Sequence, residues 1–203
     1  MKSPSVLDHL NLANAITSLS ICASIAAIFL VIEERVHAAL VVGAITLPCD
    51  VLDGVVARRF KTTGSFGAQL DSLTDAIAFG VVPAVIGYAA GVRGTLALIP
   101  AAYVLSAVWR LALFYEAGLH KDKRGRQSFS GMPTTFAAAL LYALAPLSLR
   151  LPESGRLPLL ILLYLVAAVL MNFPFSFPKT GWHTRAMWVL VPLSLATLLF
   201  SSW

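Results

Sequence analysis

Apolar residues in this chain are gathered into long runs, and short segments between the runs hold most of the charged residues. An α-helix needs about 20 mostly apolar residues to cross the hydrocarbon core of a bilayer. Each span must be helical, because an open strand would leave backbone groups without partners in lipid. The runs cover residues 13–32, 38–57, 69–90, 95–118, 133–151, 157–173 and 186–202. The pattern predicts an all-α polytopic membrane protein.

The composition supports the same class. Hydrophobic residues make up 58% of the 203 residues and charged residues 12%, whereas soluble domains have about 45–50% apolar and about 25% charged residues. No segment between the runs is long enough to be a linker, which predicts a single integral-membrane domain, residues 1–203. Residues 4–12, "PSVLDHLNL", fit either a short interfacial helix or a tail without regular structure.

The net charge of +5 would suggest nucleic acid in a soluble protein, but here the basic residues first report membrane topology. With the N-terminus in the cytoplasm, basic side chains favour the cytoplasmic side. Inside fall Lys2, Arg58, Arg59, Lys61, Lys121, Lys123, Arg124, Arg126, Lys179 and Arg185; outside fall Arg35, Arg93, Arg150 and Arg156. We therefore expect a multi-pass protein of the cell (inner, cytoplasmic) membrane, with no nucleic-acid partner.

Four aspartates interrupt the apolar pattern in "CDVLDGVVARRFKTTGSFGAQLDSLTD", residues 49–75. Asp50 and Asp53 are three residues apart near the end of the second run, and Asp71 and Asp75 are four apart at the start of the third. These spacings place each pair on one helix face. Because the connecting segment 59–66 is short, the two helices should be antiparallel neighbours, with all four carboxylates converging at the cytoplasmic face.

Four carboxylates at close range repel one another, and a divalent cation relieves that repulsion. Oxygen ligands favour Mg²⁺ or Mn²⁺, with Ca²⁺ less favoured, and do not suit zinc. Four carboxylates can hold two ions that share oxygen ligands. A solvated run of interfacial charge is the plain alternative, but it does not explain two aspartate pairs in helical register. A cation transporter is the functional rival, and it predicts carboxylates near the bilayer midplane.

The spacing D-x2-D-G-x2-A-R-x8-G-x3-D-x3-D resembles the signature of the CDP-alcohol phosphotransferase family. Its fixed positions here are Asp50, Asp53, Gly54, Ala57, Arg58, Gly67, Asp71 and Asp75. The resemblance implies an enzyme that transfers a phosphatidyl-type group from a CDP-linked donor to an alcohol and releases CMP. It also implies a six-helix core, residues 13–173 here, a homodimer and a dinuclear metal site. The run at 186–202 would be an additional span.

The resemblance also implies roles for individual residues. The four aspartates would be the metal ligands, and Asp75 the general base. The donor, CDP-diacylglycerol, would lie against Asp50, Asp53, Gly54, Ala57, Arg58, Thr63, Gly67, Asp71 and Arg110. Arg110 lies within the fourth run, and arginines inside a span usually face the protein interior. It would hold the donor phosphate, which we favour because it is level with the aspartates, or an acceptor carboxylate; a structural pair with Glu116 or an aspartate is the alternative.

Two further stretches bear on the acceptor. "AQLDSLTDAIAFGVVPA" (68–84) and "FSGMPTT" (129–135) resemble segments of the CDP-diacylglycerol–serine phosphatidyltransferases, so serine is the favoured acceptor. Leu113, Tyr115, Met132 and Thr135 depart from that pattern, which keeps glycerol 3-phosphate, inositol and another amino-alcohol open. Candidate acceptor-binding residues are Ser128, Ser130, Gly131, Pro133 and Thr134.

Overall fold

The computed structural model describes residues 5–122 and 125–179, together with the single positions 189, 192, 193 and 196. Three short strands occur in these residues: β1 (His120–Lys121), β2 (Gln127–Ser130) and β3 (Ser176–Pro178). The helical elements are η1 (Val6–His9), α1 (Leu12–Ile32), α2 (Val36–Phe60), α3 (Ser65–Asp75), η2 (Ala76–Val81), α4 (Val82–Ala89), η3 (Gly94–Ala97), α5 (Leu98–Ala117), α6 (Thr134–Leu149) and α7 (Glu153–Asn172).

Five helical segments of the described chain are long and apolar enough to cross a membrane. They are Leu12–Ile32, Val36–Phe60, Ser65–Ala89, Gly94–Ala117 and Glu153–Asn172. These segments overlap the first four and the sixth of the runs expected from the sequence, so the prediction of an integral multi-pass membrane protein is confirmed. The expected span at 186–202 lies outside the described residues, apart from the single positions given above.

The fifth expected span is α6, a helix of 16 residues that is shorter than the others. It packs against α2, α7 and η2, and its buried residues include Ala137, Ala138, Leu141 and Tyr142. A helix whose surroundings are mostly protein does not need the full thickness of the lipid core to satisfy its backbone. The short length of α6 therefore fits its place inside the bundle.

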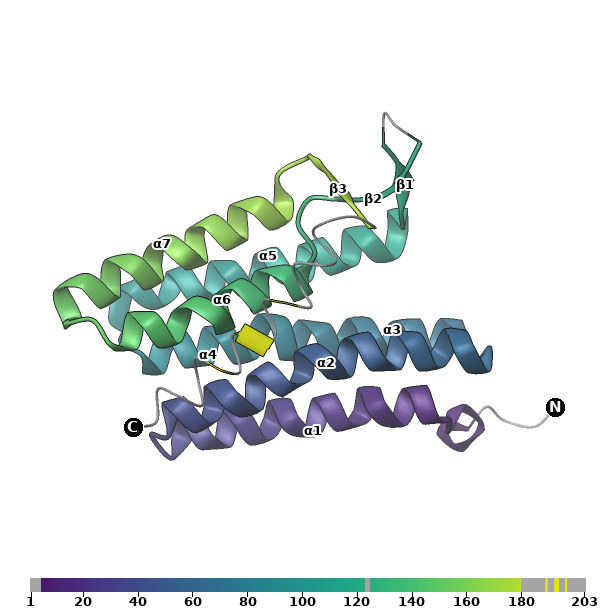
Figure 1. Ribbon diagram of the computed structural model, residues 1–203, viewed down its shortest axis with the longest axis horizontal. Coiled ribbons are helices and arrows are strands. Elements are labelled where there is room, and N and C mark those ends of the chain that lie inside the picture. Colours follow the sequence, from purple (N-terminus) through teal and green to yellow (C-terminus); the bar gives the residue numbers. More distant parts are fainter. Residues whose placement is uncertain (1–4, 123–124, 180–188, 190–191, 194–195, 197–203) are drawn as a thin grey trace.

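The helices form two groups that diverge toward one end of the molecule (Figure 1). α1, α2 and α3 run side by side in one group, and α5, α6 and α7 form the other. Fully buried side chains fill the space where the groups meet, among them Leu47, Phe79, Tyr103, Tyr142 and Tyr164. The α1–α2, α4–α5 and α6–α7 connections lie at the closed end, opposite the small sheet (Figure 1).

The third span is not one continuous α-helix. α3 ends at Asp75, a π-helical segment, η2, follows, and α4 begins at Val82. The Val82 N–H donates to the carbonyl of Ile77, five residues back. A π-helical turn inserts one extra residue into an α-helix and is frequent at functional sites. The sequence predicted a single helix here, and only Gly80 and Pro83 indicate an irregular turn within it.

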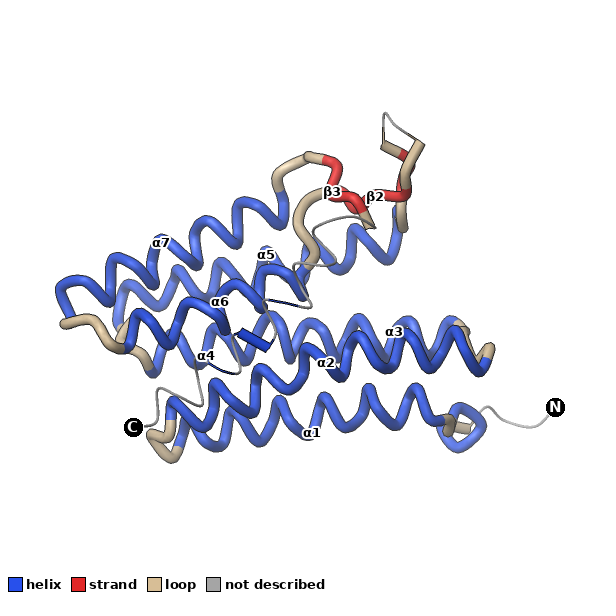
Figure 2. The backbone as a smooth tube through the Cα atoms, in the orientation of Figure 1, coloured by secondary structure: helices blue, strands red, loops and turns tan. Residues whose placement is uncertain are grey.

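β1, β2 and β3 form an antiparallel sheet at the open end of the bundle (Figure 2). Ser128 of β2 is opposite His120 on one side and Pro178 on the other. The Gly131 N–H also donates to the carbonyl of Phe175, 2.8 Å away. The sheet thus ties the α5–α6 connection to the chain that follows α7. Strands this short carry no alternating pattern, and we did not expect them from the sequence.

The segment before α1 contains a single 3-10 turn, η1. Its N-cap Ser5 and Asp8 form a reciprocal capping box. The His9 ring stacks on Phe66, at the start of α3, with ring centroids 4.1 Å apart. Of the two expectations for residues 4–12, the short helix is the one that the described part follows, as one turn packed against α3.

Candidate metal centre and substrate cavity

The four aspartates come together from two antiparallel helices. α2 ends at Phe60, and the next residue, Lys61, adopts a left-handed conformation with φ of 54°. α3 begins at Ser65, after a connection of four residues. This tight connection places Asp50 and Asp53 against Asp71. One carboxylate oxygen from each of these three residues lies within 4.8 Å of the other two. The Asp75 carboxyl group completes the cluster by contacting that of Asp50.

Two hydroxyl groups contact the cluster. The Thr17 hydroxyl on α1 lies 2.6 Å from a carboxylate oxygen of Asp53. Thr135 at the start of α6 lies 3.5 Å from Asp50, at the limit of a hydrogen bond. Among the described residues, no salt bridge includes any of the four aspartates. Arg58 and Arg110 line the same cavity, so the four carboxylates have positive charge nearby but no ion pair that would neutralise them.

A divalent ion fits this donor set. All the candidate ligands are carboxylate oxygens, which hard cations such as Mg²⁺ and Mn²⁺ prefer. Asp53 has only 6% of its surface exposed, and a buried carboxylate without a charged partner is costly. The geometry that the sequence predicted, with carboxylates converging from two helices, is present, and the cluster can hold a divalent metal.

A cavity of about 390 Å³ opens beside the aspartates. Its walls come from both groups of helices and from the α2–α3 connection, so it lies where the groups diverge. It is lined by Ala13, Asn14, Thr17, Asp50, Asp53, Gly54, Ala57, Arg58, Thr62, Thr63, Gly64, Gly67, Ala68, Asp71, Asp75, Arg110, Leu111, Phe114, Phe129, Pro133, Thr134 and Thr135. Every residue of the expected donor site is therefore at this cavity.

Two glycines keep the α1–α2–α3 wall of the cavity shallow. The guanidinium of Arg58 folds over Gly54, and a Cβ added at Gly54 would lie 3.3 Å from Nη1 of Arg58. A Cβ added at Gly67 would lie 3.1 Å from the side-chain oxygen of Asn14. Both contacts are tighter than usual, so glycine at these positions leaves room for the side chains of Arg58 and Asn14.

Arg110 on α5 is 4% exposed and faces the same cavity. Its Nε–H donates to the carbonyl of Met132, 3.2 Å away. Its guanidinium carbon lies 5.6 Å from the ring centroids of both Phe114 and Phe129. No salt bridge with Glu116 or an aspartate is present in the described structure. Arg110 is thus held by its neighbours while its charge remains available to a bound anion.

The expected acceptor residues divide into two sets. Pro133 and Thr134 line the cavity, together with Thr135. Ser128, Ser130 and Gly131 do not line it. Ser128 is fully buried in β2, with its hydroxyl 3.4 Å from the carbonyl of Arg126. Ser128 and Ser130 belong to the sheet, which the sequence did not reveal.

Sequence reasoning missed the contribution of α1. Thr17 and Asn14 line the cavity, and Thr17 contacts Asp53 directly. The signal available was the polar stretch "NAITSLS" within an otherwise apolar run. Phe114 and Phe129 also line the cavity and were missed. Phe114 lies in an expected span, where aromatic residues are usually lipid-facing or core residues, and Phe129 lies in β2, which the sequence did not reveal.

A family model described as CDP-alcohol phosphatidyltransferase matches residues 10–198. The chain belongs to this family. The match covers the first six expected spans and most of the seventh, and the aspartate cluster lies within it. The family resemblance drawn from the spacing of the eight signature residues is therefore confirmed.

Several curated relatives share one name, CDP-diacylglycerol–serine O-phosphatidyltransferase. The Mycobacterium tuberculosis (strain CDC 1551 / Oshkosh) protein is 29% identical over 195 residues, which are 94% of this chain and 66% of the relative. The Helicobacter pylori (strain ATCC 700392 / 26695) protein is 34% identical over 168 residues, 77% of this chain and 68% of the relative. The Methanocaldococcus jannaschii protein is 33% identical over 138 residues, 68% of this chain and 61% of the relative. The chain thus spans just under two thirds of the mycobacterial relative's length.

Proposed function

We propose that this protein transfers a phosphatidyl group from CDP-diacylglycerol to the hydroxyl of L-serine, forming phosphatidylserine and releasing CMP. The observation that carries the proposal is the cluster of four aspartates at a cavity that also holds a buried, unpaired arginine. The name shared by the relatives in three distant organisms supports serine as the acceptor.

The donor nucleotide would lie on the α1–α2–α3 side of the cavity. Gly54, Ala57, Thr63 and Gly67 form this wall without bulky side chains, and the Arg58 guanidinium lies over Gly54. An arginine can bind a phosphate through two parallel hydrogen bonds. The diacylglycerol chains would extend into the lipid beside the bundle.

Two divalent ions, Mg²⁺ or Mn²⁺, would be held by Asp50, Asp53, Asp71 and Asp75. When bound, they would neutralise charge on the diphosphate and on the departing CMP. Asp53 is oriented for this role by Thr17, and Asp50 by the weaker contact to Thr135. Such hydrogen bonds to ligating carboxylates fix their direction.

Asp75 would act as the general base. It lies one turn further along α3 from the connecting loop than Asp71, and it lines the cavity. Asp75 would take the proton of the serine hydroxyl. The serine oxygen would form a bond to the phosphorus that carries diacylglycerol, and the bond from that phosphorus to the CMP oxygen would break.

Arg110 would bind the carboxylate of serine. The sequence favoured the donor phosphate, but Arg110 bonds to the Met132 carbonyl and shares its wall with Pro133 and Thr134, the expected acceptor residues that reach the cavity. Phe114 and Phe129 flank the guanidinium and fix its plane. A planar guanidinium held in this way suits a carboxylate.

The open end of the bundle would face the cytoplasm of the cell membrane. Arg58, Arg59, Lys61, Lys121 and Arg126 belong to the connections and helix ends at that end, and basic residues favour the cytoplasmic side. The opposite end carries Arg35, Arg93 and Arg150 in its connections and Arg156 in the first turn of α7. The family resemblance adds the proposal that the protein is a homodimer.

The decisive experiment gives the purified protein CDP-diacylglycerol and Mn²⁺ with serine, glycerol 3-phosphate, inositol or ethanolamine, each alone. We expect CMP release and a new phospholipid with serine, at a kcat/KM at least tenfold above the others. A higher value with another alcohol would overturn serine as the acceptor and keep the chemistry. No CMP release with any of them, combined with cation flux in vesicles, would favour a transporter.

A further inference from the structure

Two carbonyl groups in η2 lack the hydrogen-bond donor that a regular α-helix would give them. In an α-helix, the carbonyl of Ala78 would accept from the Val82 N–H, but that group donates to Ile77 instead. The next residue, Pro83, has no N–H, so it can serve neither Ala78 five residues back nor Phe79 four residues back. Ala78 and Phe79 are both buried, where an unpaired carbonyl is costly.

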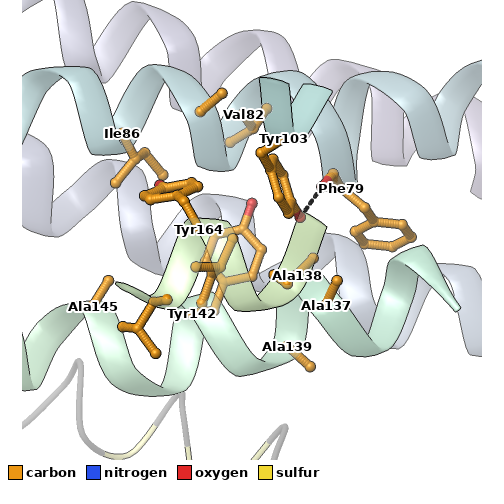
Figure 3. Packing of buried hydrophobic residues seen from close by; sticks show 14 of the residues in the cluster. Phe79, Val82, Ile86, Tyr103, Ala137, Ala138, Ala139, Tyr142, Ala145 and Tyr164 are labelled. Atoms are coloured by element: carbon orange, nitrogen blue, oxygen red, sulfur yellow. Dashed lines mark hydrogen bonds between the residues drawn. The ribbon is translucent and has the colours of Figure 1, made fainter. Parts of the chain in front are cut away.

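Two tyrosines from other helices supply the missing donors. The Tyr103 hydroxyl on α5 donates to the carbonyl of Phe79 over 2.6 Å, and the Tyr142 hydroxyl on α6 donates to that of Ala78 over 3.2 Å. Both side chains are 0–1% exposed. Figure 3 shows the Tyr103–Phe79 bond, with the Tyr142 ring packed in the same core. The hydroxyls therefore stabilise the π-helical form of this segment.

Tyr142 also touches the other helix of the aspartate cluster. A Cβ added at Gly43 on α2 would lie 2.7 Å from the Tyr142 hydroxyl and 2.9 Å from its ring. The residue therefore packs in a notch that only glycine provides. Tyr142 spans the space between α2, which carries Asp50 and Asp53, and η2, which directly follows Asp75.

The extra residue of the π turn sets the direction in which Asp75 points. One residue of an α-helix corresponds to about 100° of rotation. With the turn present, Asp71 lies beside both α2 aspartates and Asp75 contacts Asp50, while Val82 and Ile86, beyond the turn, are buried in the core. If the stretch were α-helical throughout, the two aspartates could not face α2 while Val82 and Ile86 pointed into the core.

We propose that Tyr103 and Tyr142 are positioning residues for the metal centre: their hydroxyls hold η2 in its π-helical form and so orient Asp71 and Asp75 toward Asp50 and Asp53. The proposal rests on the proposed metal-dependent function of the cluster. It assigns the tyrosines no contact with substrate or metal. Their influence passes through the helix backbone.

The test measures Mn²⁺ affinity without substrate, by electron paramagnetic resonance of the purified protein in detergent, beside the thermal midpoint of unfolding. Tyr103→Phe and Tyr142→Phe remove only a hydroxyl. We expect each to weaken Mn²⁺ binding by about tenfold, the lower end of what loss of an orienting partner costs a metal site. Turnover should recover most of the way at saturating Mn²⁺.

Tyr164→Phe is the matched control. Tyr164 is equally buried and donates to the carbonyl of Pro83. That carbonyl lies in α4, where the Gly87 N–H is the regular helical donor. We expect Tyr164→Phe to lower the thermal midpoint as much as the other two variants but to change Mn²⁺ affinity less than twofold.

A second variant tests the cause. Pro83→Ala restores an N–H that can serve Ala78 or Phe79, so the tyrosine hydroxyls become less necessary. We compare the change in log Kd for Mn²⁺ that Tyr103→Phe causes in the parent protein and in the Pro83→Ala variant. We expect the change in the Pro83→Ala variant to be less than half of that in the parent protein. Equal effects in the two backgrounds would contradict the backbone route.

The proposal is overturned if Tyr103→Phe and Tyr142→Phe lower the thermal midpoint as Tyr164→Phe does but leave Mn²⁺ affinity unchanged. It also falls if neither Tyr103→Phe nor the double variant Pro83→Ala, Tyr103→Phe can be purified in folded form, because restoring the N–H then has no effect. Failure of the proposed metal centre itself gives a different result: Asp71→Asn would then bind Mn²⁺ as tightly as the parent protein does.

Discussion

The hydroxyl of Thr17 on α1 lies 2.6 Å from the carboxylate of Asp53 on α2. Both side chains are at most 6% exposed, so this contact is shielded from water. Asp53 belongs to the cluster of carboxylates that faces the cavity. The first helix is therefore part of the candidate metal centre as well as a membrane anchor.

Removing that hydroxyl should weaken metal binding without unfolding the protein. Thr17→Val keeps the side-chain shape and leaves Asp53 without its partner. We expect the Mn²⁺ concentration for half-maximal activity to rise about tenfold, because partners of metal ligands typically contribute 10–100-fold. Thr46→Val is the control, since the buried Thr46 hydroxyl bonds to the carbonyl of Gly43 on its own helix and to no aspartate among the described residues. Equal effects of the two variants would remove any special role for Thr17.

Asp75→Asn should separate proton transfer from donor binding. We expect kcat to fall by about 10²–10⁴-fold, the usual contribution of a general base. The three carboxylates grouped within 4.8 Å do not include Asp75, so CDP-diacylglycerol should still bind. Binding is measured by equilibrium dialysis of a labelled donor with Mn²⁺. Loss of donor binding in proportion to turnover would make Asp75 mainly a metal ligand.

Arg110→Lys should raise the KM for serine by at least tenfold with little change in the KM for CDP-diacylglycerol. Lysine keeps the charge but loses the planar fork and the position between Phe114 and Phe129. The measurement is a pair of titrations, each with the other substrate saturating. A defect confined to donor kinetics would move Arg110 to the donor phosphate. Full activity of Arg110→Lys with lower stability of Arg110→Ala would indicate a structural role.

Gly131→Ala should destabilise the open end of the protein. Gly131 has a φ of +73°, and an added Cβ would collide with the carbonyl of Met171. Gly94→Ala is the control, because Gly94 has a φ of +62° but no atom within 4 Å of an added Cβ. Backbone strain of about 1–3 kcal/mol is common to both. The thermal midpoint of Gly131→Ala should therefore be the lower by several degrees.

The sequence predicted the spans and the aspartate cluster because both follow from short-range rules. A helix through "CDVLDG" must place Asp50 and Asp53 on one face, and the short loop forces α2 and α3 to be neighbours. The ends of the expected spans differ from those of the helices by a few residues. Long apolar runs leave a membrane chain little alternative to helix.

The rest depended on contacts between distant residues. The π turn at η2 depends on Pro83, which has no N–H, and on Tyr103 and Tyr142, which donate in its place. These tyrosines are 24 and 64 residues from their acceptors in the sequence. The sheet exists because β3, after α7, pairs with β2. Ser128 and Ser130 looked like acceptor residues only because that pairing is invisible in the local sequence.

The most direct test of the account follows serine and CMP together. The purified protein receives CDP-diacylglycerol, Mn²⁺ and radiolabelled serine, and lipid-bound label and released CMP are counted over time, with Asp71→Asn as the control. We predict one labelled lipid per CMP, and less than about a hundredth of that rate in the variant, since removing a residue of a metal-activated site has effects of this size. CMP release without labelled lipid, or Asp71→Asn at more than a tenth of the parent rate, would contradict serine transfer at this cluster.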